Sequence, residues 1–240
     1  MRVIAFLNFI ISKLKKTEYK LDDSIKTVNV LGIVFFRLMS IWRGILRRIG
    51  LKECGRILFV GKKVKLRNKN AISFGNGVTL DDYVCLDGLS REGLRIGNNV
   101  KVGSYTIIAC SGSLKNLGKG IIIGDNSGIG DFSFFGAAGG IKIGSNVIMG
   151  QNVRFHSENH NFIRTDIPIK EQGVTNKGIT IGDDCWIGSG VVFLDGVEVG
   201  KGCVIGANTL VNKNIPSYSV AVGNPVKIVK SRLEKKEMVN

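Results

Sequence analysis

The chain has 240 residues, with 34 Lys or Arg against 19 Asp or Glu and a formal net charge of +15. Its 44% hydrophobic content excludes a wholly disordered chain, and its 32 glycines follow no collagen period. Five cysteines without a C-x-x-C pair exclude a disulfide scaffold and a zinc ribbon, which fits a reducing compartment.

The positive charge is concentrated at the two ends of the chain. Residues 1–57 hold 12 Lys or Arg and four acids, a net charge of +8, and residues 226–240 add +3. Such ends attract anionic partners in general. The usual nucleic-acid-binding motifs are absent from the sequence, so we expect no nucleic-acid partner.

Residues 1–57 are predicted to form a basic amphipathic helical head. The apolar stretch Arg2–Leu14 is too short to span a bilayer, and lysines follow it where a signal peptide would have a cleavage site. A second helix is predicted over Val28–Leu51, with cations on one half of its surface and large apolar side chains on the other.

The sequence leaves two explanations for this head open. Its apolar face could pack on the rest of the protein or on another subunit. Alternatively, residues 2–52 could lie in a membrane interface, with the cations facing anionic headgroups.

From about residue 58 the chain repeats every six residues. An aliphatic or aromatic residue is followed by Gly or another small or acidic residue, with a small or branched residue four places on. The clearest run starts its hexads at Ile181, Ile187, Phe193, Val199, Ile205 and Val211. The phase slips only after every third hexad, at residues 90–95, 112–122, 137–142 and 157–180.

Eighteen residues therefore form one structural unit, and all insertions are predicted to emerge at the same corner. Three short strands per turn of chain predict a triangular parallel β-solenoid over residues 58–225, whose first-position side chains stack inward as a continuous core. The small following residue is expected to allow the bend at each corner. Neither a helix nor a hairpin sandwich has a period of six.

This pattern resembles the hexapeptide-repeat acyltransferases, whose fold is a left-handed parallel β-helix. The likeness is closest over residues 141–232. The segment from Phe155 to Phe162 is similar to the region around the catalytic histidine of the sugar and polysaccharide O-acetyltransferases. Residues 132–140 depart from that pattern, so the resemblance does not name the acceptor.

The resemblance implies acetyl transfer from acetyl-CoA to a hydroxyl of a saccharide, such as a cell-envelope or capsular polysaccharide precursor. An imidazole suits the removal of a proton from a poor nucleophile at neutral pH. By family position His160 is the expected base, at the start of the long insertion 157–180, and His156 is the second candidate. Glu158 lies between them and could orient an imidazole.

The resemblance also implies binding residues. Trp186 matches a tryptophan beside the active site. Ser189 and Ala207 match positions that line the pantetheine tunnel, while Asn212, Lys213 and Lys230 match positions near the nucleotide of coenzyme A. The family is usually trimeric, with active sites between subunits, so we expect a homotrimer, located in the cytoplasm or at the inner face of the cell membrane. A C-terminal helix is expected within residues 226–240.

Other functions remain as alternatives. An N-acetyltransferase acting on an amino sugar is the nearest, and a non-catalytic β-helix scaffold is the alternative of another class. A zinc hydratase of this architecture needs three histidines, and the sequence has only His156 and His160, so we expect no metal. A covalent acetyl-cysteine route is possible in principle, but direct transfer in a ternary complex is expected.

Overall fold

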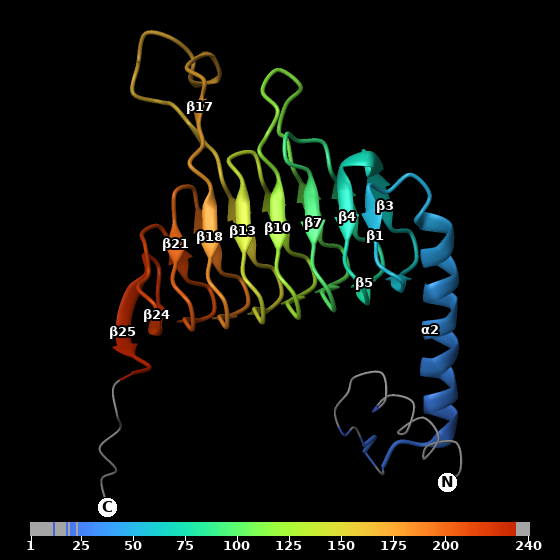
Figure 1. Ribbon diagram of the computed structural model, residues 1–240. Coiled ribbons are helices and arrows are strands. Elements are labelled where there is room, and N and C mark those ends of the chain that lie inside the picture. Colours follow the sequence, from blue (N-terminus) through green and yellow to red (C-terminus); the bar gives the residue numbers. More distant parts are fainter. Residues whose placement is uncertain (1–11, 13–17, 19, 23, 234–240) are drawn as a thin grey trace, which may run out of the picture.

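The computed structural model describes residues 12, 18, 20–22 and 24–233. In this part of the chain, helix α2 (Thr27–Arg47) stands at one end of a long parallel β-helix (Figure 1). The predicted helix over Arg2–Leu14 and the segment Glu234–Met238 lie outside the described residues, apart from Ser12.

Three sheets make the walls of the β-helix. Sheet A contains β1 (Glu53–Cys54), β4 (Ile72–Phe74), β7 (Leu94–Ile96), β10 (Ile121–Ile123), β13 (Ile141–Ile143), β18 (Ile179–Ile181) and β21 (Glu198–Val199). Sheet B contains β2 (Leu58–Val60), β5 (Val78–Leu80), β8 (Lys101–Val102), β11 (Gly128–Ile129), β14 (Ile148–Met149), β19 (Trp186–Ile187), β22 (Val204–Ile205), β24 (Ser219–Val222) and β25 (Lys227–Ser231). Sheet C contains β3 (Lys65–Arg67), β6 (Cys85–Asp87), β9 (Ile107–Ala109), β12 (Phe134–Gly136), β15 (Arg154–His156), β20 (Val192–Leu194) and β23 (Leu210–Val211).

Apart from β25, the strands of these sheets pair in parallel with the equivalent strand of the neighbouring coil. Ile121 of β10, for example, is in register with Ile141 of β13, which is in register with Ile179 of β18. Side chains at the first hexad position are buried and stack along the axis, as the repeat predicts. In sheet C the rings of Phe135, Phe155 and Phe193 stack with centroids 4.7 and 4.6 Å apart.

The small residue after each strand has a different role from the expected one. A Cβ added to Gly188 would lie 2.5 Å from the amide nitrogen of Ala207 in the next coil. Glycine is therefore required here because the coils approach closely, not because the chain bends. The left-handed backbone conformation falls two places later, at residues such as Asn146 (φ 59°) and Asn208 (φ 56°), a conformation that Asn adopts more readily than most residues.

Helix α2 ends at Arg47, and β1 already pairs with β4 of sheet A. The predicted boundary between residues 57 and 58 therefore lies too late, since the first coil begins at Glu53. The part of the first coil before residue 58 is too short to show the six-residue period in the sequence.

The polar face of α2 packs on the first coil. Gly44 is buried against Leu58, and Arg43 Nε donates to the carbonyl oxygen of Val60 (2.7 Å). Arg48 donates to carbonyl oxygens of Arg56 and Cys54. Among the described residues, the β-helix therefore contacts the arginine-bearing face of this helix, and the large apolar side chains of the other face stay exposed. Edge strands of a solenoid expose unpaired backbone groups, and the arginines satisfy them.

The C-terminal end also differs from the expectation. Lys227–Ser231 forms the strand β25, antiparallel to β24, where a helix was predicted within 226–240. An antiparallel strand covers the edge of sheet B at the last coil, which a helix starting at this point would leave exposed.

The insertions emerge at the corner between sheets C and A, as predicted. Two of them form long projections on the same side of the molecule, residues 111–119 and 157–178 (Figure 1). The second contains a hairpin of β16 (Asn159–His160) and β17 (Val174–Thr175), and the short 3-10 helix Ile169–Glu171. The shorter 3-10 turn Lys69–Ala71 precedes β4.

Candidate active site

A cleft of about 320 Å³ lies where the two projecting loops leave the β-helix. Sheet C and the corner that follows it supply its floor, and the two loops supply its walls. Its lining consists of small residues, one ring and three ionisable side chains: Ala109, Ser111, Gly112, Phe134, Gly136, Ala137, Ala138, His156, Ser157, Glu158 and His160.

The floor of the cleft is open because small residues face outward on two neighbouring strands. Ala109 of β9 and Gly136 of β12 are in register with each other, and Gly136 is in register with His156 of β15. Side chains alternate across a strand, so Phe155 points into the core and His156 points to the cleft. Gly136 belongs to the stretch 132–140 that departs from the family pattern, and this departure shapes the floor.

His156 is held on the rigid sheet rather than on a loop. Its ring lies against Phe134, with centroids 5.7 Å apart and planes tilted by 38°. Partial burial, with a smaller effect of the Arg154 charge, lowers the pKa of His156 from its usual 6.5. The neutral imidazole, which can accept a proton, is therefore favoured near neutral pH.

Ser157 anchors the start of the long loop. Its side chain is buried, and its hydroxyl donates to the carbonyl oxygen of Gly136 (2.7 Å) and accepts from the amide of Gly139 (3.0 Å). These bonds tie the residue after His156 to the coil below. The chain can then turn outward without leaving a buried polar atom unsatisfied.

His160 reaches the same cleft from the β16–β17 hairpin, where it pairs with Val174. Asp195 holds the base of this hairpin. Its carboxylate accepts from the amides of Lys177 (2.9 Å) and Gly178 (2.8 Å) and from the side chain of Asn159 (3.5 Å). The imidazole of His160 is exposed on the cleft side, so a reactant can reach it.

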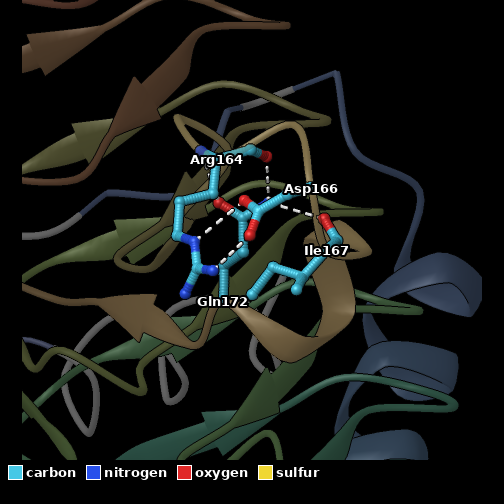
Figure 2. Close-up of polar contacts among 4 residues, drawn as sticks. All are labelled: Arg164, Asp166, Ile167 and Gln172. Carbon is cyan, nitrogen blue, oxygen red and sulfur yellow. Dashed lines mark hydrogen bonds and ion pairs between the residues drawn. The ribbon is translucent and has the colours of Figure 1, made fainter.

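The outer part of the long loop is closed on itself by Gln172 (Figure 2). The Gln172 side chain donates to the carbonyl oxygens of Arg164 (2.7 Å) and Ile167 (3.2 Å) and accepts from the Arg164 amide (3.0 Å). Arg164 in turn forms an exposed ion pair with Asp166. The loop therefore has a defined shape of its own beyond the hairpin.

Glu158 lines the cleft between the two histidines. Its carboxylate lies near the loop over residues 111–119. A Cβ placed on Gly112 of that loop would lie 3.8 Å from Glu158 Oε1. Within the described part of the chain, no hydrogen bond joins Glu158 to either imidazole. The structure thus brings all three predicted catalytic residues together, and the orienting role of Glu158 stays a prediction.

Trp186 does not line this cleft. It lies on β19 of sheet B, 59% exposed, in register with Ile148 and Val204, whereas His156 lies on sheet C. Within a single chain, the predicted substrate-binding tryptophan therefore lies on a different wall of the β-helix from the cleft that holds the predicted base. Its role in the site stays a prediction that requires a second copy of the chain.

The predicted coenzyme A residues gather in three places, all toward the C-terminal coils. Ser189 and Ala207 follow β19 and β22, at the corner between sheets B and C. Asn212 and Lys213 follow β23 and are exposed, as is Lys230 on β25. None of the five lines the cleft, so their contact with coenzyme A stays a prediction.

The cysteines are poorly placed for a covalent route. Cys110, Cys185 and Cys203 are buried, and burial raises the pKa of the Cys110 thiol to about 12. None of the five cysteines lines the cleft that holds the histidines. Among the residues that the structure describes, no group of three or more His, Cys, Asp or Glu could hold a metal ion.

A larger hollow of about 460 Å³ lies over sheet A. Its lining contains three lysines and two glutamates but no histidine or cysteine: Lys119, Lys142, Lys177, Glu92 and Glu198 are its charged members. It contains no imidazole, the side chain best matched to proton removal near neutral pH, so the smaller cleft is the candidate active site.

Three residues of the site were missed by sequence reasoning. Ser157 sits at an inward repeat position, so a polar residue there was a signal. Gln172 and Asp195 act only through contacts with residues distant along the chain, which the repeat does not encode.

Comparison with known proteins agrees with this architecture. The family described as bacterial transferase hexapeptide (six repeats) matches residues 178–213. A probable acetyltransferase of Mycobacterium tuberculosis is 37% identical over 140 residues, which cover 58% of this chain and 44% of that protein. The chain thus spans less than half the length of that relative.

Two further similarities cover more of the chain. An Escherichia coli protein, provisionally named a lipopolysaccharide biosynthesis O-acetyl transferase, is 26% identical over 78% of this chain and 83% of its own length. The crystal structure of AntD, an N-acyltransferase from Bacillus cereus, superposes with a TM-score of 0.55 at 21% identity, over 79% of this chain and 88% of AntD.

The predicted fold class, a parallel β-helix of left-handed type, is confirmed. Repeat, fold and similarity agree over the same coils. Over these coils the chain is therefore similar to the hexapeptide-repeat acyltransferases.

Proposed function

We propose that the protein transfers an acetyl group from acetyl-CoA to a hydroxyl of a saccharide. The observation that carries the proposal is the cleft in which His156, Glu158 and His160 converge beside a floor of small residues. Similarity to named acetyltransferases supports the reaction class, and a galactoside O-acetyltransferase of Lactococcus lactis, 39% identical over 86 residues, supports a sugar acceptor.

The chemistry follows from the histidines. The neutral imidazole takes the proton of the acceptor hydroxyl while the hydroxyl oxygen bonds to the carbonyl carbon of the thioester. The tetrahedral intermediate collapses, the carbon–sulfur bond breaks, and the imidazolium returns the proton to the departing thiolate. The products are the acetyl ester and free coenzyme A, and a backbone N–H would stabilise the oxyanion.

We assign the base to His160 and keep His156 as the second candidate. Both imidazoles are exposed and line the cleft, and His160 occupies the position that matches the catalytic histidine of the similar O-acetyltransferases. His156 lies against Phe134 on the sheet, and its lowered pKa favours the neutral imidazole. In this assignment His156 shapes the floor and contacts the acceptor.

A neighbouring copy would complete the site. Sheet B presents an exposed apolar row that includes Ile148 (64%) and Trp186 (59%), and sheet C presents Ile107 (45%) and Phe134. In contrast, the outward positions of sheet A include Lys142, Thr180 and Glu198. A trimer in which sheet B of one copy faces sheet C of the next would bring Trp186 to the histidines and bury both rows.

The acceptor we propose is a precursor of a cell-envelope or capsular polysaccharide. The support is similarity over most of the chain to the E. coli protein whose name refers to lipopolysaccharide biosynthesis. Lys213 and Lys230 are exposed cations suited to the phosphates of coenzyme A.

The test is release of free thiol from acetyl-CoA with pooled sugar acceptors. We expect His160→Ala to lower kcat by about 10²- to 10⁴-fold, because the hydroxyl loses its base. Lys170→Ala, in the same loop but outside the cleft, is the control and should keep the wild-type rate. Full activity of His160→Ala would refute the assignment of the base to His160, and absence of thiol release with every acceptor would refute the proposed acetyl transfer. Hydroxylamine cleaves an acetyl ester but not an amide, so it separates O- from N-acetylation.

A further inference from the structure

Helix α2 has two faces with different environments. The face that includes Arg37, Arg43, Gly44 and Arg48 is attached to the first coil of the β-helix. At 100° per residue, the opposite face carries a continuous apolar row. Its members are all more than half exposed: Val28, Leu31, Phe35, Leu38, Trp42, Ile45, Leu46 and, just beyond the helix, Ile49.

An exposed row of this kind needs an occupant, because soluble surfaces rarely show so many large apolar side chains together. Nothing in the described part of the chain covers it. The row also points away from the β-helix, since its polar counterpart is bonded to the edge carbonyls of the first coil.

The surrounding charge indicates what the occupant is. No Asp or Glu occurs from residue 24 to residue 52. Lys26 precedes the helix, Arg47 is its last residue, and Lys52 lies just beyond it. The chain as a whole carries +15. A large apolar stripe flanked only by cations complements an anionic lipid surface, whose headgroups attract Lys and Arg while its acyl boundary accepts apolar side chains.

The attachment also decides how the helix lies. By length and composition α2 could cross a bilayer, with a mean hydropathy of 1.5 over its most apolar window. However, Arg43 donates to Val60 and the Arg37 guanidinium lies 5.0 Å from the centre of the Phe59 ring. A spanning α2 would carry these arginines and the edge of β2 into hydrocarbon, where unsatisfied backbone and charge are costly.

We infer that α2 is an in-plane anchor that docks the first-coil end of the β-helix on an anionic membrane. Its apolar row enters the headgroup boundary while its arginine face remains on the protein. Docking would hold the protein at a surface where lipid-linked acceptors are found, but it does not depend on acetyl transfer.

The first measurement is sedimentation of the full chain with vesicles of phosphatidylcholine alone or mixed with phosphatidylglycerol. We expect binding only to the anionic vesicles, weakened by salt. Leu38→Glu should reduce the partition coefficient at least about tenfold. Val229→Glu introduces the same charge at an exposed apolar position of β25, at the other end of the β-helix, and should bind as the wild type does.

The second measurement reports geometry. Trp42 and Trp186 are the two tryptophans of the chain, so Trp42 is the single reporter in the Trp186→Phe variant. We expect a blue shift on anionic vesicles, and stronger quenching by lipids brominated near the carbonyl than near the terminal methyl. Equal quenching along the acyl chain would indicate a spanning helix and overturn the in-plane anchor.

Two further results would overturn the inference. One is wild-type protein that stays in solution with anionic vesicles at low salt. The other is a fall in molecular mass of Leu38→Glu by light scattering without vesicles, relative to Val229→Glu, which would mean that a second copy of the chain covers the row.

Discussion

At the scale of single residues, the alternation of side chains decides which groups can do chemistry. Phe155 faces the core and His156 faces the cleft because they are neighbours on one strand. Ser157 then returns to an inward position, where its hydroxyl bonds to Gly136 and Gly139. Three successive residues thus serve packing, the site and the anchoring of the loop.

The environment of His156 predicts a pH dependence of stability. Its pKa is lowered in the folded protein, so the unfolded chain binds the proton first as the pH falls. Stability should therefore decline from about pH 7 toward pH 5, beginning near the unfolded pKa of about 6.5 and levelling off below the folded value.

Thermal unfolding across that range checks this expectation. The melting temperature of His156→Gln should depend less on pH than that of the wild type. His160→Gln is the comparison, in which the imidazole of the projecting loop is replaced instead. Parallel curves for the wild type and His156→Gln would contradict the proposed neutral His156.

At the scale of elements, the projecting loops are built differently from the β-helix that carries them. The coils are held by repeated parallel pairing, whereas the loop over residues 157–178 depends on a few side chains. Asp195 fixes its base and Gln172 closes its outer part (Figure 2). Loss of one such contact should change the loop and leave the coils intact.

Gln172→Ala tests this separation. The variant loses the hydrogen bonds to Arg164 and Ile167, so we expect cleavage within residues 161–173 by limited proteolysis to become about tenfold faster. The melting temperature should stay close to that of the wild type. Gln151→Ala, at an exposed corner of the β-helix, is the control. A large drop in melting temperature would instead make Gln172 part of the global fold.

At the scale of the whole molecule, the separation of Trp186 and the histidines on two sheets predicts a shared site. Neither His160→Ala nor Trp186→Ala should be active alone. Mixed trimers, refolded together from equal amounts, should recover about a quarter of the wild-type activity, because random assembly places an intact His160 beside an intact Trp186 at that frequency.

Activity that stays at the level of the separate variants would contradict a site formed between copies. Light scattering of the mixed sample shows whether trimers were present during the assay. A monomeric wild type would contradict the same prediction more directly.

The architecture was predictable from the sequence because a hexad repeat is a local signal summed over many coils. Ile181, Ile187 and Phe193 show the period without knowledge of any contact. The corner at which insertions emerge, and the outward position of His156, follow from the same phase. The grouping of Glu158 and His160 with it was expected from family resemblance and close spacing.

The tertiary structure decided what depends on contacts between distant residues. It showed that α2 packs through its arginines and that Lys227–Ser231 is a strand. An amphipathic pattern states that a helix has two faces but not which face meets the protein. That choice depends on the partner surface, here the unpaired carbonyls of the first coil, which exist only once the coils have formed.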